Sequence, residues 1–244
     1  MNYNFLNNSQ FVIVDYTPGS SGQLFLRLWA ELDSRLDYND EKILSKSINN
    51  NVSSTEIAYR IPVTKKIVNW FLEKTAPVTA DDYLTFFEYL GNFIVAQPWS
   101  KESKIKYYEN GKDIIYPSII LYAMHTKDKL IPKEVKALAP NLEILSIVPT
   151  TDRGKQYQLD RAIACYNQRK EEWPQMISQF NNKDHFETFD FCSMLVDNDT
   201  DCILKYLEEK IGQEFFLNEK LDKARLILNT YYSVVVNNLE SINV

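Results

Sequence analysis

Apolar runs and periodic apolar positions along the chain predict strands that alternate with helices. A β-branched apolar run at residues 11–16 is typical of a buried strand. Leucines at every fourth position then predict a helix over residues 22–36. Further apolar runs predict strands at 118–124 and 142–148, and residues 185–191 favour a fourth.

Helical spacing recurs through the rest of the chain. It predicts helices at about 64–75, after Thr79, and at about 132–138, 156–172, 199–211 and 218–238. Thr79 with Asp82 resembles a capping box, Gly212 is expected to stop one helix, and Asn218 to cap the last. The helix after Thr79 has an aromatic and aliphatic stripe that we assign to the core, formed by Tyr83, Phe86, Phe87, Leu90, Phe93 and Ile94.

The order of these elements predicts an α/β fold, with a mainly parallel sheet between two helical layers (three-layer α/β/α). Sheets of this kind bind ligands beyond the carboxyl ends of their strands. That rule places four features at one edge: the loop at 17–22, His125, the loop at 149–154, and the region after Phe191.

No linker or internal repeat divides the sequence, so we expect a single domain over residues 1–244. Residues 37–58 are rich in Asn and Ser and predict a mobile insertion that contributes nothing to a core. Three interpretations of this insertion are open: an exposed connector, a lid over the 17–22 loop, or a partner-binding segment.

Composition excludes several classes of protein. The formal net charge of −6 argues against a surface devoted to nucleic acid or anionic membrane. The three cysteines have no metal-ligand spacing and are expected to be reduced thiols, as in a cytoplasmic protein. We find no signal peptide, no membrane span and no metal motif, and the oligomeric state is not determined by the sequence.

The strongest chemical signal is the small-residue segment after the first strand. A strand, a Gly/Ser loop and a helix together direct backbone N–H groups at one point, which attracts an anion and most often a phosphate. An ordinary tight turn is the alternative interpretation. The Walker A pattern is absent, because Gln23 stands where its lysine should be and Leu24 where its hydroxyl should be. Magnesium-dependent ATP or GTP hydrolysis is therefore not expected.

The order of motifs resembles the sulfotransferases that use 3′-phosphoadenosine 5′-phosphosulfate (PAPS), a P-loop-like α/β family. The resemblance comes from Tyr16-Thr17-Pro18 before the Ser/Gly loop, a later strand ending in His125, and a further strand leading to an arginine loop. It implies that the loop holds the 5′-phosphosulfate through Gly19, Ser20, Ser21, Gly22, Gln23 and Leu24. It also implies His125 as the catalytic base, and Arg153 with Lys155 near the 3′-phosphate.

The chain also departs from that family. Ser20 replaces the family's loop lysine, Pro149 stands in place of the arginine that opens the third loop, and the late basic Gly-rich motif has no counterpart in 213–244. For Arg153, a surface position at a helix start is the alternative, and Arg161 competes for its role. For His125, the alternative is a structural histidine.

Three functions therefore follow as hypotheses. The first is sulfuryl transfer from PAPS, as a small-molecule nucleotide, to an acceptor hydroxyl or amine. The second is a catalytically inactive binding or scaffolding protein of the same fold. The third, a small-molecule kinase with unusual loop chemistry, is the least favoured, because the Lys-Ser/Thr pair is missing.

Overall fold

The structure is a computed structural model of the chain. It describes residues 6–7, 10–36, 79–95, 119–124, 132–165 and 171–237. His125, the insertion predicted at 37–58 and the helix predicted at 64–75 lie outside the described residues.

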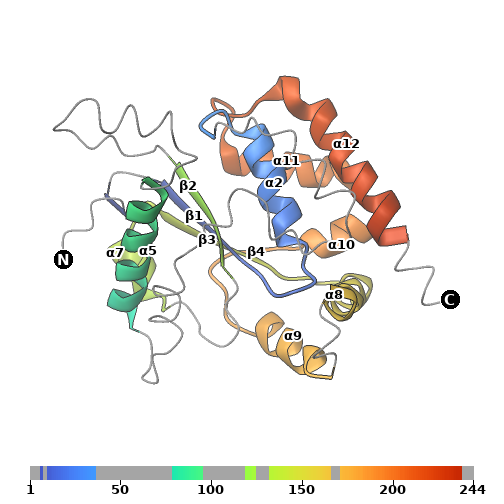
Figure 1. The fold of residues 1–244 in the computed structure, drawn as a ribbon, viewed down its shortest axis with the longest axis horizontal. Helices are drawn as coiled ribbons and strands as arrows, with labels where there is room; N and C mark the ends of the chain where they lie inside the picture. Colours follow the sequence, from blue (N-terminus) through green and yellow to red (C-terminus); the bar gives the residue numbers. More distant parts are fainter. Residues whose placement is uncertain are drawn as a thin grey trace. The chain divides into compact units, whose positions relative to one another are not determined.

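The described part is a mixed α/β structure, as the alternation of apolar patterns predicts (Figure 1). Its elements are β1 (Gln10–Asp15), α2 (Gly22–Leu32), α5 (Ala80–Val95), β2 (Ile119–Met124), α7 (Glu134–Leu138), β3 (Leu142–Ile147), α8 (Asp152–Cys165), α9 (Trp173–Asn181), β4 (Thr188–Phe189), α10 (Phe191–Val196), α11 (Thr200–Ile211), η3 (Asn218–Lys220), α12 (Leu221–Tyr231) and η4 (Tyr232–Val236).

The described strands form one small sheet in the order β2-β1-β3-β4. Strands β3 and β4 are parallel, with Ser146 opposite Thr188 and Ile147 opposite Phe189. Strand β4 has two residues and is shorter than the predicted 185–191. The reason is local: the Asp190 side chain accepts from the Ser193 N–H and caps α10, so Phe191 begins a helix. The three-layer, P-loop-like arrangement stays a prediction.

The chain falls into two compact units. Unit 1 comprises Met1–Ile13, Arg60–Tyr122 and Lys129–Glu143, and unit 2 comprises Val14–Tyr59, Ala123–Asp128 and Ile144–Val244. The expectation of a single domain stays a prediction.

In unit 1, helix α5 begins as the sequence predicts. The Thr79 N–H donates to Asp82 Oδ2 (3.0 Å) and the Asp82 N–H donates to Thr79 Oγ1 (3.3 Å), which confirms the capping box. Tyr83, Phe86 and Phe87 are buried, so this part of the stripe is core, and α5 packs against α7. The other three stripe residues have side chains outside the described part of the structure.

Unit 2 is built around helix α2, which lies beside α11 and α12 (Figure 1). Phe25 of α2 is fully buried, and its ring centroid lies 5.3 Å from that of Phe191 and 5.4 Å from that of Phe189. Trp29, one turn further along, meets Phe25 edge to face at 6.0 Å. Each such aromatic pair adds about 0.5–1.5 kcal/mol beyond simple burial. These contacts fix α2, and with it the loop that precedes the helix.

Helix α2 ends at Leu32, four residues before the predicted end at 36. Asp33 leaves the helix with extended backbone (φ −101°, ψ 114°) and forms an antiparallel bridge with Phe216. Its buried carboxylate accepts from Trp29 Nε1 at 3.0 Å and from the Arg35 guanidinium at 2.7 and 2.8 Å. This competing set of hydrogen bonds ends the helix despite the continuing leucine pattern.

The end of helix α11 agrees with the prediction from sequence, whereas the start of helix α12 differs from it. Helix α11 buries Ile203, Leu204, Leu207 and Ile211, and Gly212 stops it with φ 87°. Asn218 does not cap α12 but lies in the 3₁₀ turn η3. After Tyr231 the helix changes to a π-helical turn over η4, which buries Val235 and Val236 in succession. Turns of this kind are frequent at functional sites.

Candidate functional site

The loop between β1 and α2 has the backbone form of an anion-binding concavity. The dihedral φ is positive at Gly19 (90°) and Ser21 (57°) but not at Ser20 or Gly22. Alternation of left- and right-handed residues points successive N–H groups to the same side of the chain. The φ signs at residues 19–22 follow this pattern and lead directly into the first turn of α2.

The amides at the start of α2 divide into two groups. Those of Leu24 and Phe25 donate to the Ser21 carbonyl at 2.9 and 3.2 Å. Those of Gly22 and Gln23 have no acceptor among the residues that the structure describes. A serine at this position usually caps its own helix, but the Ser21 side chain does not. Two N–H groups at the positive end of α2 are therefore left for another acceptor.

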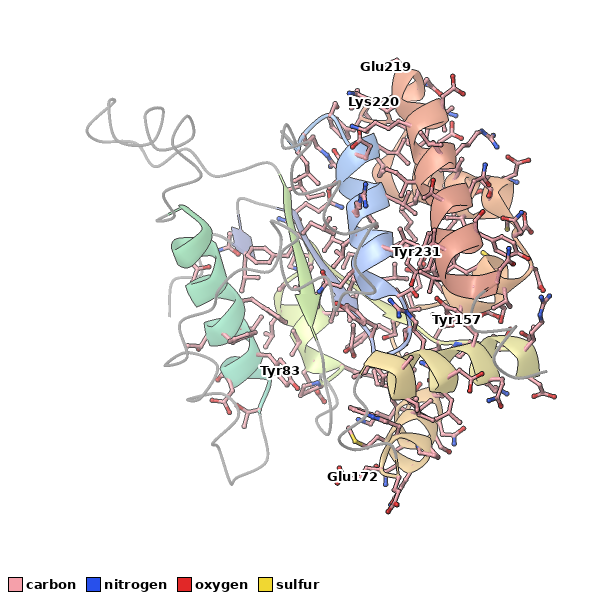
Figure 2. All side chains as sticks on the ribbon, turned by 45° about the vertical axis from the view of Figure 1, so that its right-hand side comes forward. Tyr83, Tyr157, Glu172, Glu219, Lys220 and Tyr231 are labelled. Atoms are coloured by element: carbon pink, nitrogen blue, oxygen red, sulfur yellow. The ribbon has the colours of Figure 1, made fainter. Side chains whose placement is uncertain are left out.

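The Ser21 hydroxyl instead joins a cluster from three elements, which we name the hydroxyl triad: Ser21, Tyr157 of α8 and Tyr231 of α12. Ser21 Oγ lies 2.7 Å from Tyr157 Oη and 2.8 Å from Tyr231 Oη, and the two phenolic oxygens are 3.2 Å apart. Figure 2 labels both tyrosines, Tyr157 on α8 and Tyr231 at the end of α12. The triad ties the loop to the two helices that flank it.

The environment of Tyr157 raises its pKa well above the ordinary value. Burial is the main cause, and the neighbouring Tyr231 adds to it. Folding therefore holds this phenol in its neutral form at pH values where the unfolded chain would ionise it.

This shift predicts a loss of stability at high pH. Above about pH 10, the unfolded state releases the Tyr157 proton while the folded state retains it, so the free energy of unfolding falls. The slope due to this one group reaches about 1.4 kcal/mol per pH unit. Urea unfolding at pH 9 to 11.5 should show a steeper decline for the wild type than for Tyr157→Phe. Parallel declines would contradict the prediction.

A second set of hydrogen bonds lies beneath the loop. Gln158 Nε2 of α8 donates to Thr17 Oγ1 (2.9 Å) and Ser20 Oγ (2.6 Å), and Asn181 Nδ2 donates to Gln158 Oε1 (2.9 Å). Ser20 is fully buried, so this hydroxyl is committed to the interior. The other serine of the loop, Ser21, is the one next to the unsatisfied amides of Gly22 and Gln23.

The predicted basic residues lie elsewhere on α8. This helix begins at Asp152 rather than 156, so Arg153 and Lys155 are in its first turn and not in a loop. Arg153 is half exposed and donates to Asp197 Oδ1 at 3.0 Å, while Lys155 Nζ lies 3.9 Å from Asp152 Oδ1. The ion pairs of these two side chains are with Asp197, at the end of α10, and with Asp152, in the same turn of α8. His125, the predicted base, lies outside the described residues.

The sheet-edge rule does bring two of the predicted segments together. The Thr150 N–H donates to Asp190 Oδ2 at 2.9 Å, and Thr151 Oγ1 lies 2.7 Å from Ser193 Oγ. The 149–154 segment therefore contacts the start of α10, as expected from the carboxyl ends of neighbouring strands.

Two further side chains are accounted for structurally. Cys192 is buried against the Ser20 carbonyl (Sγ–O 3.6 Å), and burial raises the pKa of its thiol, so it is not an activated nucleophile. His185 is half buried; its Nε2 lies 2.9 Å from the Phe180 carbonyl, and burial lowers its pKa.

Sequence reasoning missed Tyr157, Gln158 and Tyr231. The first two had a detectable signal, because they follow a strand-end loop on a predicted helix. Tyr231 had none: its sequence separation from Ser21 is 210 residues.

No protein-family model, no curated protein and no solved structure matches this chain. In the described residues, no group of three or more His, Cys, Asp or Glu side chains could hold a metal ion. None of the described helices combines the length and the apolar character needed to cross a membrane.

Proposed function

We propose that residues 19–24 bind the phosphosulfate of PAPS and that the protein transfers the sulfuryl group to an acceptor hydroxyl or amine. One observation carries the binding half of this proposal. Alternating φ signs at 19–22 lead to the unsatisfied amides of Gly22 and Gln23 at the positive end of an 11-residue helix. The order of motifs in the sequence supports the transfer half.

The reaction requires one bond to form as another breaks. The acceptor oxygen or nitrogen attacks sulfur, the bond from sulfur to the bridging phosphate oxygen breaks, and adenosine 3′,5′-bisphosphate leaves. In this proposal His125 takes the acceptor's proton, since a histidine titrates near neutral pH. The amides of the loop stabilise charge on the phosphosulfate oxygens, and removing such a donor typically costs about 10²–10³ in rate.

The test is calorimetric titration of the protein with adenosine 3′,5′-bisphosphate, followed by an assay of sulfuryl transfer from PAPS. We expect saturable binding, and at least tenfold weaker binding for Gly22→Ala. A Cβ at Gly22 would lie 2.3 Å from the Tyr16 ring, so the first turn of α2 would have to move. Lys205→Ala, an exposed change on α11, serves as the control and should bind normally. No heat with the wild type at millimolar ligand would contradict the proposal.

A second candidate is a catalytically inactive binding protein of the same fold. The pairing of Arg153 favours it, because the guanidinium expected at the 3′-phosphate forms an ion pair with Asp197 at the surface. This candidate predicts that the nucleotide binds but that no sulfuryl transfer occurs, in the wild type or in His125→Ala. Transfer that is lost in His125→Ala would eliminate it.

A further inference from the structure

The hydroxyl triad is a polar cluster that the proposed chemistry does not use. It combines a residue of the loop with residues from two distant helices, and its members approach each other at 2.7, 2.8 and 3.2 Å. Each hydroxyl has one proton, so three contacts consume all three protons when the cluster is closed. In that closed arrangement the Ser21 side chain is held from two sides.

Ser21 needs such restraint because its backbone is left-handed (φ 57°, ψ 25°). For a residue with a Cβ this conformation is disfavoured, and glycine is the usual choice. The conformation of Ser21 also sets where the next two amides point, and these are the amides of Gly22 and Gln23 that lack an acceptor in the described part of the chain.

We propose that Tyr157 and Tyr231 are positioning residues for anion binding: their hydroxyls hold Ser21 in the left-handed conformation that aims the Gly22 and Gln23 amides at the ligand. This inference rests on the proposed function, and it gives helix α12, through Tyr231, a role in the conformation of the anion-binding loop. The two tyrosines act through Ser21 and need no contact with the ligand.

Two substitutions of Ser21 separate its backbone conformation from its hydroxyl group. Glycine adopts the left-handed conformation without steric cost, whereas alanine does not. Ser21→Gly should therefore bind adenosine 3′,5′-bisphosphate about tenfold more tightly than Ser21→Ala. Equal affinities of these two variants would overturn the proposal, because neither variant has a hydroxyl and they differ in backbone preference.

The tyrosines are tested in a double-mutant cycle by calorimetric titration. Tyr231→Phe and Tyr157→Phe should each weaken binding of the same nucleotide by about threefold to tenfold in the wild-type background. In the Ser21→Gly background, Tyr231→Phe should have no further effect on affinity. A general structural role would give the same loss in both backgrounds, and that result would overturn the proposal. Tyr232→Phe is the matched control, since its hydroxyl has no hydrogen-bond partner in the described residues.

The nucleotide-free protein separates this inference from the proposed function. The Leu24 and Phe25 amides donate to the Ser21 carbonyl, so their hydrogen exchange reports the conformation of Ser21. Tyr231→Phe should accelerate exchange at these two amides about threefold to tenfold, and Tyr232→Phe should not. If the wild type binds no nucleotide, the proposed function fails, and accelerated exchange then supports the restraint of Ser21 alone. Unchanged exchange in Tyr231→Phe would refute the restraint itself.

Discussion

Gly19→Ala is expected to lower the free energy of unfolding by about 3–5 kcal/mol, because two independent costs combine. The residue has φ 90°, which side-chain-bearing residues rarely adopt. A Cβ there would also lie 2.0 Å from the Gln158 carbonyl oxygen and 3.0 Å from the Ala162 nitrogen, both of them backbone atoms of α8. Rigid backbone cannot move aside as a flexible side chain can. Urea unfolding of the wild type and the variant measures the difference.

Gly212→Ala is the matched control for this prediction. It has nearly the same dihedral (φ 87°), but its added Cβ would meet only the Glu214 carboxylate, at 3.1–3.4 Å. That side chain is exposed and can turn away, so only the cost of the backbone conformation (φ 87°, ψ 140°), about 1–3 kcal/mol, remains. Equal losses at the two glycines would show that the close packing of the loop on α8 contributes nothing.

Asp33→Ala is expected to cost about 3–5 kcal/mol, since it removes one partner of a buried ion pair. The carboxylate is fully buried and accepts from Trp29 Nε1 and from the Arg35 backbone and guanidinium. In the variant these donors lose this acceptor, and the Arg35 guanidinium remains over the Phe215 ring at 4.2 Å. Thermal or urea unfolding should show the loss.

Asp197→Ala supplies the comparison for a surface pair. Asp197 accepts from Arg153 at 3.0 Å, but both side chains are more than half exposed. Pairs of this kind contribute about 0–1 kcal/mol, so the variant should unfold close to the wild type. A loss at Asp33 no larger than that at Asp197 would contradict the assignment of Asp33 as a buried anchor.

Local pattern was enough to predict most of the described secondary structure. The Thr79–Asp82 capping box, the buried face of α11 and its stop at Gly212 all follow from interactions within one or two turns. Such interactions depend on residues that are neighbours in the sequence, so they can be predicted from a single sequence.

The errors occur where a distant partner decides the outcome. Helix α2 ends at Leu32 because Asp33 pairs with Phe216, which no periodicity in residues 22–36 could indicate. Likewise, the loop at 19–22 was found from its Gly and Ser residues, but its attachment to Tyr157 and Tyr231 depends on tertiary packing. For Arg153, the early start of α8 and the nearby Asp197 determine its direction.

The attachment of the loop to Tyr231 has a consequence for biosynthesis. Ser21 and Tyr231 are separated by 210 positions, so the ribosome adds them to the chain far apart in time. At typical elongation rates of 5–20 residues per second, the delay is about 10–40 s. Throughout that interval the Ser21 hydroxyl lacks its Tyr231 partner, and a product that terminates before residue 231 would never form this contact.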